Sequence, residues 1–173
     1  TERWSWTGLS ENPSLPWSVE LIERYKNRWD WQGLSSNKKL PWSIELISRY
    51  VDQWSWFWLN WNEALPWSSE LIDRFKAYWD WDLLAENPSL PWSMDFIKRY
   101  ADKWNWHYMS ANKSIPWPVT FLEENKDLWN WTWLSSNERL PWREPAQVAL
   151  CTSGQRSLVY EEGEDQECLA AVR

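Results

Sequence analysis

Tryptophan is the residue type whose number and spacing could do chemistry in this sequence. The chain has 21 tryptophans among 173 residues, and eighteen of them recur in register every 25 residues. Aromatic faces bind sugars, quaternary amines and peptides. Residues that recur at equivalent positions in stacked units, however, are typical of packing. We therefore predict a structural repeat core formed by the first Trp of each Trp-x-Trp pair and the Trp after each Pro: Trp4, Trp17, Trp29, Trp42, Trp54, Trp67, Trp79, Trp92, Trp104, Trp117, Trp129 and Trp142.

Aromatic residues outside this register are the candidates for binding. One position of the repeat holds, in order, Gly8, Gly33, Trp58, Leu83, Tyr108 and Trp133. Such variation marks a surface where stacking does not dictate the residue type. We predict an exposed aromatic strip, with ordinary lateral packing of the same side chains as the alternative. Its members are Phe57, Trp58, Trp61, Tyr108 and Trp133.

Residue types that serve catalysis or metal binding show no pattern in this chain. His107 is the only histidine and has no cysteine or acid at ligand spacing, so we expect it to face solvent. Cys151 and Cys168 lack the two further ligands that zinc would need. No phosphate-binding glycine loop, nucleophile elbow or paired-carboxylate motif stands out. We therefore expect no catalytic site, no metal and no cofactor, and a protein that is not an enzyme.

Composition restricts the partners. The formal net charge of −7 argues against nucleic acid and anionic membranes, because both call for clustered Lys and Arg. No apolar run approaches the roughly 18 residues of a membrane span. Residues 1–3 match the end of a preceding repeat, so we expect a longer array. We expect no signal sequence at the N-terminus, and the localisation stays open, with the cytoplasm as the preferred compartment.

Each repeat predicts two short helices, as residues 29–53 illustrate. Asp30 occupies a position that always holds Ser, Asp or Asn, the preferred N-caps. Trp29 and Leu34 flank this cap at the spacing of a hydrophobic staple. Asn37 follows within two turns, and we expect it to end the first helix in a left-handed conformation.

The second helix of the same repeat follows a connector. Leu40-Pro41-Trp42 is predicted to be extended, because a residue before Pro avoids the helical region. Ser43 is then a good N-cap, and Glu45 with Arg49 forms an acid–base pair on a solvated face. Helices this short are marginal alone, so stacking on neighbouring repeats must stabilise them.

The predicted fold is all-α: an α-solenoid of six Trp-rich helix-pair repeats over residues 1–142, starting at 4, 29, 54, 79, 104 and 129. We expect six first helices and five intact second helices, in a superhelix whose hand the pattern leaves open. In repeat five Pro118 replaces the Ser cap. Residues 143–173 form an acidic tail without Trp, which we interpret as a disordered extension, a capping segment or the start of another domain.

The motif of residues 4–17, Trp-x-Trp-x-x-Leu-Ser-x-Asn-Pro-x-Leu-Pro-Trp, resembles a group of Trp-rich short repeats found in uncharacterised bacterial and giant-virus proteins. Those repeats typically carry an Asn-Pro-x-Ile-Thr-Trp core, and Leu-Pro-Trp-Ser stands in its place here. The resemblance covers about residues 1–142. It implies a helical array of unassigned function and brings no catalytic residues with it.

These features predict a non-catalytic scaffold that presents its variable positions to a protein or peptide. Two alternatives stay open: a carbohydrate or small-ligand binding module that uses exposed aromatics, and a structural spacer in a longer protein. The packing interpretation also predicts that Trp67→Ala costs about 3 to 5 kcal/mol of stability, and that Trp58→Ala costs much less.

Overall fold

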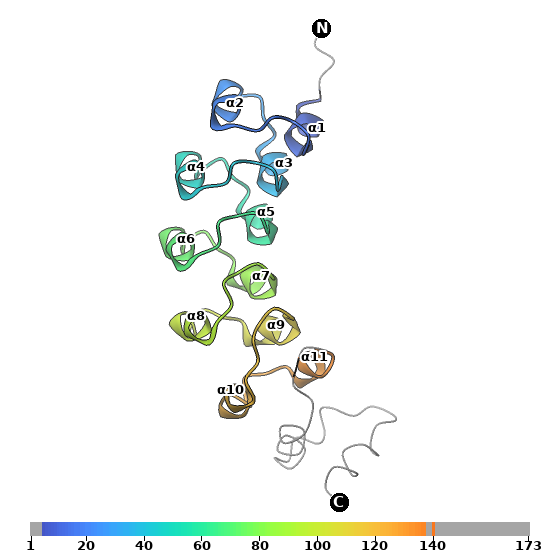
Figure 1. The fold of residues 1–173 in the computed structure, drawn as a ribbon, viewed down its shortest axis with the longest axis vertical. Helices are drawn as coiled ribbons and strands as arrows, with labels where there is room; N and C mark the ends of the chain where they lie inside the picture. Colours follow the sequence, from blue (N-terminus) through green and yellow to red (C-terminus); the bar gives the residue numbers. More distant parts are fainter. Residues whose placement is uncertain (1–4, 138–139, 141–173) are drawn as a thin grey trace, which may run out of the picture. The chain divides into compact units, whose positions relative to one another are not determined.

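The computed structural model describes residues 5–137 and residue 140. Within these residues the chain forms eleven short α-helices and no strand (Figure 1). The first helices of the repeats are α1 (Trp6–Glu11), α3 (Trp31–Ser36), α5 (Trp56–Trp61), α7 (Trp81–Glu86), α9 (Trp106–Ala111) and α11 (Trp131–Ser135). The second helices are α2 (Val19–Arg24), α4 (Ile44–Arg49), α6 (Ser69–Arg74), α8 (Met94–Arg99) and α10 (Val119–Glu124). The predicted all-α helical-repeat solenoid is confirmed in this part of the chain.

The described residues form two compact units, which divide between Pro91 and Trp92. In the first unit α1 contacts α3, α3 contacts α5 and α5 contacts α7, so the first helices form one row. The second helices α2, α4 and α6 form another row beside it (Figure 1). In the second unit α9 contacts α11. Stacking of equivalent helices therefore buries the apolar faces that each short helix cannot bury alone.

Polar caps begin the helices at the predicted positions. Asp30 accepts a hydrogen bond from the backbone N–H of Gln32 (3.1 Å), and Ser43 Oγ accepts one from that of Leu46 (3.1 Å). Ser55 and Pro118 begin α5 and α10 without a side-chain cap hydrogen bond. Each side-chain cap satisfies a backbone donor that the first helical turn leaves free, and so the local sequence determines where these helices start.

Asparagine is the C-cap of α1, α3, α5, α7 and α9, but the predicted left-handed conformation is wrong. Asn37 has φ −75° and ψ 114°, and Asn62 has φ −79° and ψ 102°, so both are extended. Oδ1 of Asn37 instead accepts a hydrogen bond from the backbone N–H of Lys39 (2.9 Å). The side chain thereby stabilises the turn in an Asx-type arrangement, and the backbone needs no left-handed residue.

The Leu-Pro-Trp connector is a tight turn rather than a plain extended segment. The backbone N–H of Trp42 donates to the carbonyl of Leu40 (2.8 Å), and the equivalent bond forms at Trp67 (2.8 Å). A hydrogen bond that spans one residue is that of a γ-turn. Pro41 suits the centre of this turn because its ring holds φ near about −65°.

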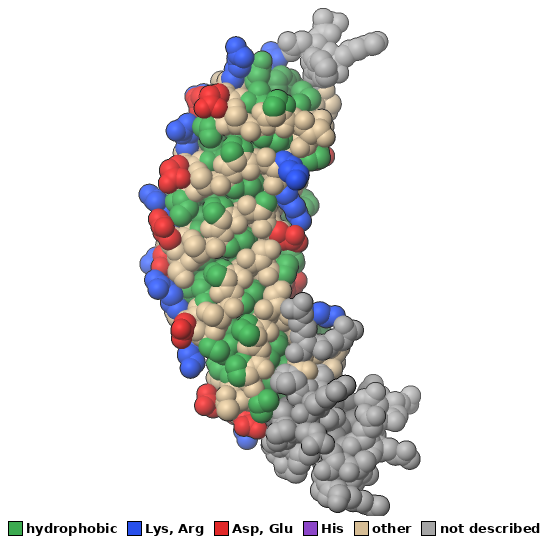
Figure 2. Space-filling view, in the orientation of Figure 1, with side chains coloured by type: hydrophobic (Ala, Val, Ile, Leu, Met, Phe, Trp, Pro, Cys, Tyr) green, Lys and Arg blue, Asp and Glu red, His purple; other side chains and the backbone are tan. Residues whose placement is uncertain are grey.

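Charged side chains border the second row of helices (Figure 2). Hydrogen bonds from its own backbone N–H and from Ser18 hold the pKa of Glu20 below its ordinary value, and the positive charge of Arg49 adds to this. The pKa of Glu45 is lowered in the same way, with Arg74 as the positive charge. Both arginines belong to the following repeat. The charge that stabilises each acid therefore comes from across the repeat boundary, not from four residues along the same helix.

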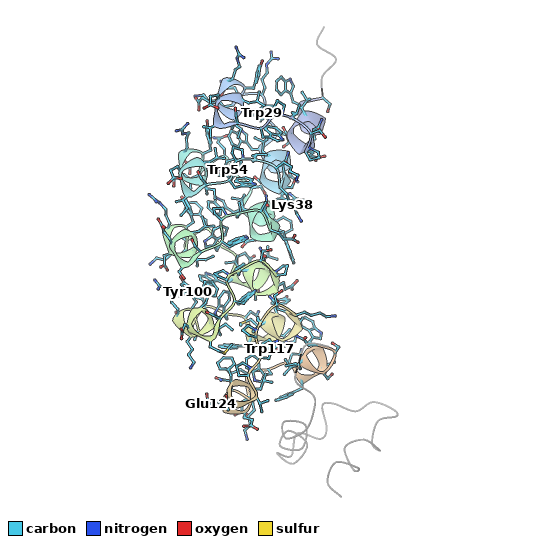
Figure 3. All side chains as sticks on the ribbon, in the orientation of Figure 1. Trp29, Lys38, Trp54, Tyr100, Trp117 and Glu124 are labelled. Atoms are coloured by element: carbon cyan, nitrogen blue, oxygen red, sulfur yellow. The ribbon has the colours of Figure 1, made fainter. Side chains whose placement is uncertain are left out.

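Five buried tryptophans join successive repeats: Trp29, Trp54, Trp79, Trp104 and Trp129. Trp54 lies between the two rows of helices (Figure 3), and its ring centroid is 4.8 Å from that of Trp31 and 4.9 Å from that of Trp42. Its indole N–H donates to the carbonyl of Ile47 (3.2 Å), so the polar atom of the ring is satisfied. Tilted and edge-to-face ring pairs at such distances add to the stability gained from burial. The first Trp of repeat three therefore packs on, and donates a hydrogen bond to, residues of repeat two.

The other predicted core tryptophans are enclosed to different degrees. Trp117 is buried, and a half-buried set comprises Trp17, Trp42, Trp67 and Trp92. Trp42 is held by its indole N–H, which donates to the carbonyl of Asn37 (3.0 Å). Trp4, Trp142 and the tail of residues 143–173 lie outside the described residues. The tryptophans after Pro mainly close the connector, whereas those that begin each repeat fill the space between repeats.

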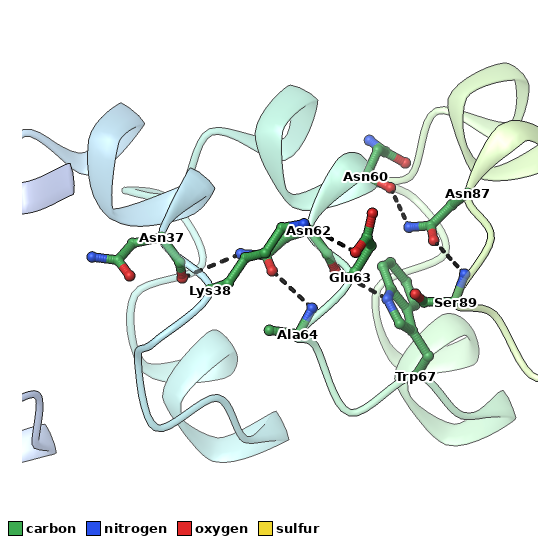
Figure 4. Close-up of polar contacts among 9 residues, drawn as sticks. All are labelled: Asn37, Lys38, Asn60, Asn62, Glu63, Ala64, Trp67, Asn87 and Ser89. Carbon is green, nitrogen blue, oxygen red and sulfur yellow. Dashed lines mark hydrogen bonds and ion pairs between the residues drawn. The ribbon is translucent and has the colours of Figure 1, made fainter. Parts of the chain in front are cut away.

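A buried asparagine links the connectors of neighbouring repeats (Figure 4). Nδ2 of Asn62 donates to the carbonyls of Ser35 (2.9 Å) and Asn37 (3.4 Å), both in the preceding repeat. Oδ1 of Asn62 accepts from the backbone N–H of Ala64 (3.0 Å), and its carbonyl accepts from the indole N–H of Trp67 (3.1 Å). One side chain thereby satisfies backbone groups in two repeats that burial would otherwise leave unpaired.

A buried serine makes a second link, between the first helices. Oγ of Ser35 accepts from the backbone N–H of Ser55 in the next repeat (2.9 Å) and donates to the carbonyl of Trp31 (2.6 Å). Ser10 and Ser110 make the equivalent bonds. In repeat three this position holds Asn60, whose Oδ1 is buried without a hydrogen-bond partner.

We expect Asn60→Ser to stabilise the first unit by about 1 to 2 kcal/mol. The substitution removes a buried unpaired oxygen and supplies the hydroxyl that bridges helices at Ser35, which is worth about this much. Urea unfolding of the full chain measures the change. The reverse substitution, Ser35→Asn, is the matched control and should destabilise; a loss of stability in both variants would contradict the link assigned to the serine.

Candidate functional site

Two large aromatic side chains are exposed next to each other on α5. Phe57 is 56% exposed and Trp58 is 36% exposed, and their ring centroids are 5.3 Å apart in an edge-to-face pair. Trp61, one turn further, is half-buried. Helical spacing places these three residues on one face of α5, because Leu59 and Asn60 occupy the buried face. The predicted α5 members of the aromatic strip therefore form one group, which we call the α5 aromatic face.

The same face of the neighbouring helix α3 carries no aromatic residue. It holds Gln32, Gly33 and Ser36 at the equivalent positions. A Cβ atom at Gly33 would lie 3.1 Å from both Ser10 Cβ and Glu11 Cγ of α1, so the glycine lets α3 approach α1 closely. Trp58 occupies this position in α5 and is partly exposed instead. Stacking therefore does not require an aromatic side chain at this position.

The helix on the other side, α7, carries acids on the equivalent face. Asp82 is exposed, whereas Leu83 and Glu86 are half-buried. Desolvation raises the pKa of Glu86, and the negative charge of Asp82 one turn away raises it further. The surface of the first unit thus passes from polar residues on α3, through aromatics on α5, to carboxylates on α7.

Two buried polar atoms without a partner in the described residues belong to α5 or to a ring that packs on Trp56 of α5. One is Asn60 Oδ1, on α5 itself, and the other is Nε1 of Trp79, just before α7. At the equivalent position in the preceding repeat, the indole N–H of Trp54 donates to a backbone carbonyl. The stacking interactions are therefore less complete where the aromatic side chains are exposed.

The two remaining predicted surface residues meet in the second unit. Tyr108 of α9 and Trp133 of α11 are half-buried, with ring centroids 5.8 Å apart. His107 is exposed, as expected, and its ring lies 4.2 Å from that of Trp133. Nδ2 of Asn130 lies 2.7 Å from Nδ1 of His107. The five predicted residues therefore fall into two groups, one in each compact unit.

Sequence reasoning missed three exposed apolar side chains. Tyr78 is 44% exposed and stacks on Trp56 of α5, with ring centroids 4.7 Å apart and an interplanar angle of 23°. Tyr25 and Leu128 are also exposed. Tyr78 and Leu128 share the position before a Trp-x-Trp pair, which otherwise holds Arg3, Arg28, Gln53 and Lys103. That change from polar to apolar was a signal in the sequence.

Within the described residues, no group of three or more His, Cys, Asp or Glu side chains is arranged to hold a metal ion. Cys151 and Cys168 lie outside those residues. None of the described helices has the length and apolar character needed to cross a bilayer.

Comparison with protein-family models, with curated proteins and with solved structures finds no significant match.

Proposed function

We propose that this protein is a non-catalytic repeat scaffold that binds a protein or peptide through the α5 aromatic face. The observation that carries the proposal is the exposure of Phe57 and Trp58 side by side, on a helix whose stacked neighbour α3 has Gln32 and Gly33 there. Large aromatic side chains exposed to water lose the free energy that burial would provide. Tyr, Trp and Phe are enriched at the centres of protein interfaces for this reason.

The incomplete stacking around α5 supports the same proposal. Repeat three carries Asn60 where Ser10, Ser35 and Ser110 bridge helices in repeats one, two and five, and Asn60 Oδ1 is unpaired. Departures from an otherwise regular stacking pattern are expected at functional positions, where stability and function conflict. The exposed rings and the unpaired amide belong to the same helix, the rings on its exposed face and the amide on its buried face.

The double variant Phe57→Gln/Trp58→Ala tests the proposal. Panning a random-peptide phage library on the full-length chain provides the ligands, and the affinity of each selected peptide is then measured on both proteins. We expect a loss of about 30-fold or more, which corresponds to removal of a hot spot of about 2 kcal/mol. Stability should change by about 1 kcal/mol or less, because both side chains are on the surface.

Leu128→Gln is the matched control, because it removes an exposed apolar side chain from the second unit. Its affinity for the selected peptides should equal that of the wild type. Peptides that bind the double variant as tightly as the wild type would show that the α5 aromatic face is not the binding surface.

The second candidate function is binding of a carbohydrate by the group in the second unit. Trp133 and Tyr108 lie beside the amide of Asn130 and the imidazole of His107, and sugar sites combine aromatic faces with such polar groups. A glycan array probed with wild type, with Trp133→Ala and, as a control from the first unit, with Trp58→Ala tests this function. Binding that survives Trp133→Ala would exclude it.

A further inference from the structure

The α5 aromatic face is continuous with two carboxylates. Because α5 contacts α7, residues at equivalent positions of the two helices are neighbours on the surface. The positions of Phe57 and Trp61 in α5 hold Asp82 and Glu86 in α7, and the position of Trp58 holds Leu83. Aromatic, aliphatic and acidic side chains therefore share one exposed side of the first unit.

The position of Gly33 in the repeat lies where two first helices meet. At the start of the unit, the last residue of α1, Glu11, lies against Gly33 of α3, where an added Cβ would be 3.1 Å from Glu11 Cγ. Leu83 is the equivalent residue of α7, and α7 contacts α5. Asp82 precedes Leu83 and Glu86 follows it by one turn, so the two acids flank this position on α7.

The charges at Asp82 and Glu86 of α7 favour the binding of a cation. Two carboxylates four residues apart on a helix repel each other. Partial desolvation raises the pKa of Glu86, and the charge of Asp82 adds to it. Lys38, at the end of the helix on the other side of α5, forms an ion pair with Glu63 at 3.0 Å. A positive charge from outside the chain would relieve the repulsion and would also be attracted to the exposed ring faces of α5.

We propose that the peptide bound by the α5 aromatic face is cationic, with an Arg or Lys that lies between Asp82 and Glu86 and an apolar side chain that packs on Phe57 and Trp58. This inference rests on the proposed peptide-binding function and adds the chemistry of the partner. The carboxylates give the cation its charge complement, and the aromatic rings supply apolar area and a cation–π contact. The overall charge of −7 acts in the same direction at long range.

Three fluorescein-labelled peptide pools test the charge of the partner on the full-length chain. The pools share the same fixed Leu and Phe residues and carry Lys/Arg, Gln/Ser or Asp/Glu at the remaining positions. We expect fluorescence anisotropy to show that the Lys/Arg pool binds about tenfold or more tightly than the Gln/Ser pool. The double variant Asp82→Asn/Glu86→Gln should abolish this preference, whereas the control Glu70→Gln, which removes an exposed acid from α6, should retain it.

The outcomes separate this inference from the proposed function. Equal binding of the three pools, lost in Phe57→Gln/Trp58→Ala, would overturn the cationic partner and support the α5 aromatic face as a peptide site. A preference for the Lys/Arg pool that persists in Asp82→Asn/Glu86→Gln would also overturn the inference of a cation bound at these two acids, because other residues would then recognise the positive charge. Absence of binding for every pool would overturn both proposals.

Discussion

Replacement of Asn62 by leucine is expected to lower the free energy of unfolding by about 3 kcal/mol. The amide donates to the carbonyls of Ser35 and Asn37 and accepts from the N–H of Ala64, and Asn62 is only 2% exposed. Leucine has a similar size but leaves these backbone groups without that partner inside the protein. Each buried group left unpaired costs about 1 to 3 kcal/mol. Urea unfolding, followed by far-ultraviolet circular dichroism, measures the change.

Asn12→Leu is the control for this prediction. Asn12 is the equivalent residue in the first repeat and is half-buried, and Oδ1 accepts from the N–H of Ser14 (2.9 Å). Its substitution should remove one partly exposed turn bond and cost about 1 kcal/mol. Equal losses at the two positions would show that the asparagine stabilises only the local turn and does not link repeats.

The second large effect is expected for Trp54→Ala, at about 3 to 5 kcal/mol. The ring is 4% exposed, packs on Trp31 and Trp42 of the preceding repeat, and donates to the carbonyl of Ile47. Alanine would leave a cavity between two repeats and an unpaired carbonyl at its edge. Chemical denaturation again provides the measurement, with near-ultraviolet circular dichroism to report loss of the aromatic cluster.

Trp42→Ala and Trp58→Ala complete this series, because they remove the same side chain from less buried positions. Trp42 is half-buried and Trp58 is on the surface, so we expect the losses to fall in the order Trp54, Trp42, Trp58. The structure also changes the expectation for Trp67→Ala. Trp67 is half-buried, so this substitution should lower the free energy of unfolding by less than Trp54→Ala does. A series with three equal values would contradict the assignment of the first Trp of each repeat to the space between repeats.

The positions of the helices could be predicted from short-range sequence patterns. Ser43 and Asp30 cap helices where they were expected to, because an N-cap acts on backbone groups two or three residues away. The end of the first helix was predicted at the correct residue but with the wrong conformation, since Asn37 turns the chain through its side chain. The γ-turn at Pro41 was missed, because the rule for the residue before Pro describes a preference and not a hydrogen bond.

The candidate surface could be predicted only in part. Variation at the position of Gly33, Trp58 and Leu83 identified the side of the repeat that stacking does not determine. Tyr78 was missed although the position before each Trp-x-Trp pair is polar in four repeats and apolar only at Tyr78 and Leu128. The contact between α5 and α7 involves residues of different repeats, and no sequence pattern states how two stacked helices are shifted relative to each other.

The sequence by itself determined the repeat length, the all-α class, the helix starts and the set of residues that vary between repeats. Those features depend on interactions within one repeat, which the 25-residue register displays directly. Only the tertiary structure decided the role of Asn62, the burial of Trp54 rather than Trp42, and the exposure of Phe57 and Trp58. The physical reason is that each of these depends on what the neighbouring repeat places against a side chain, and the sequence of one repeat does not contain that contact.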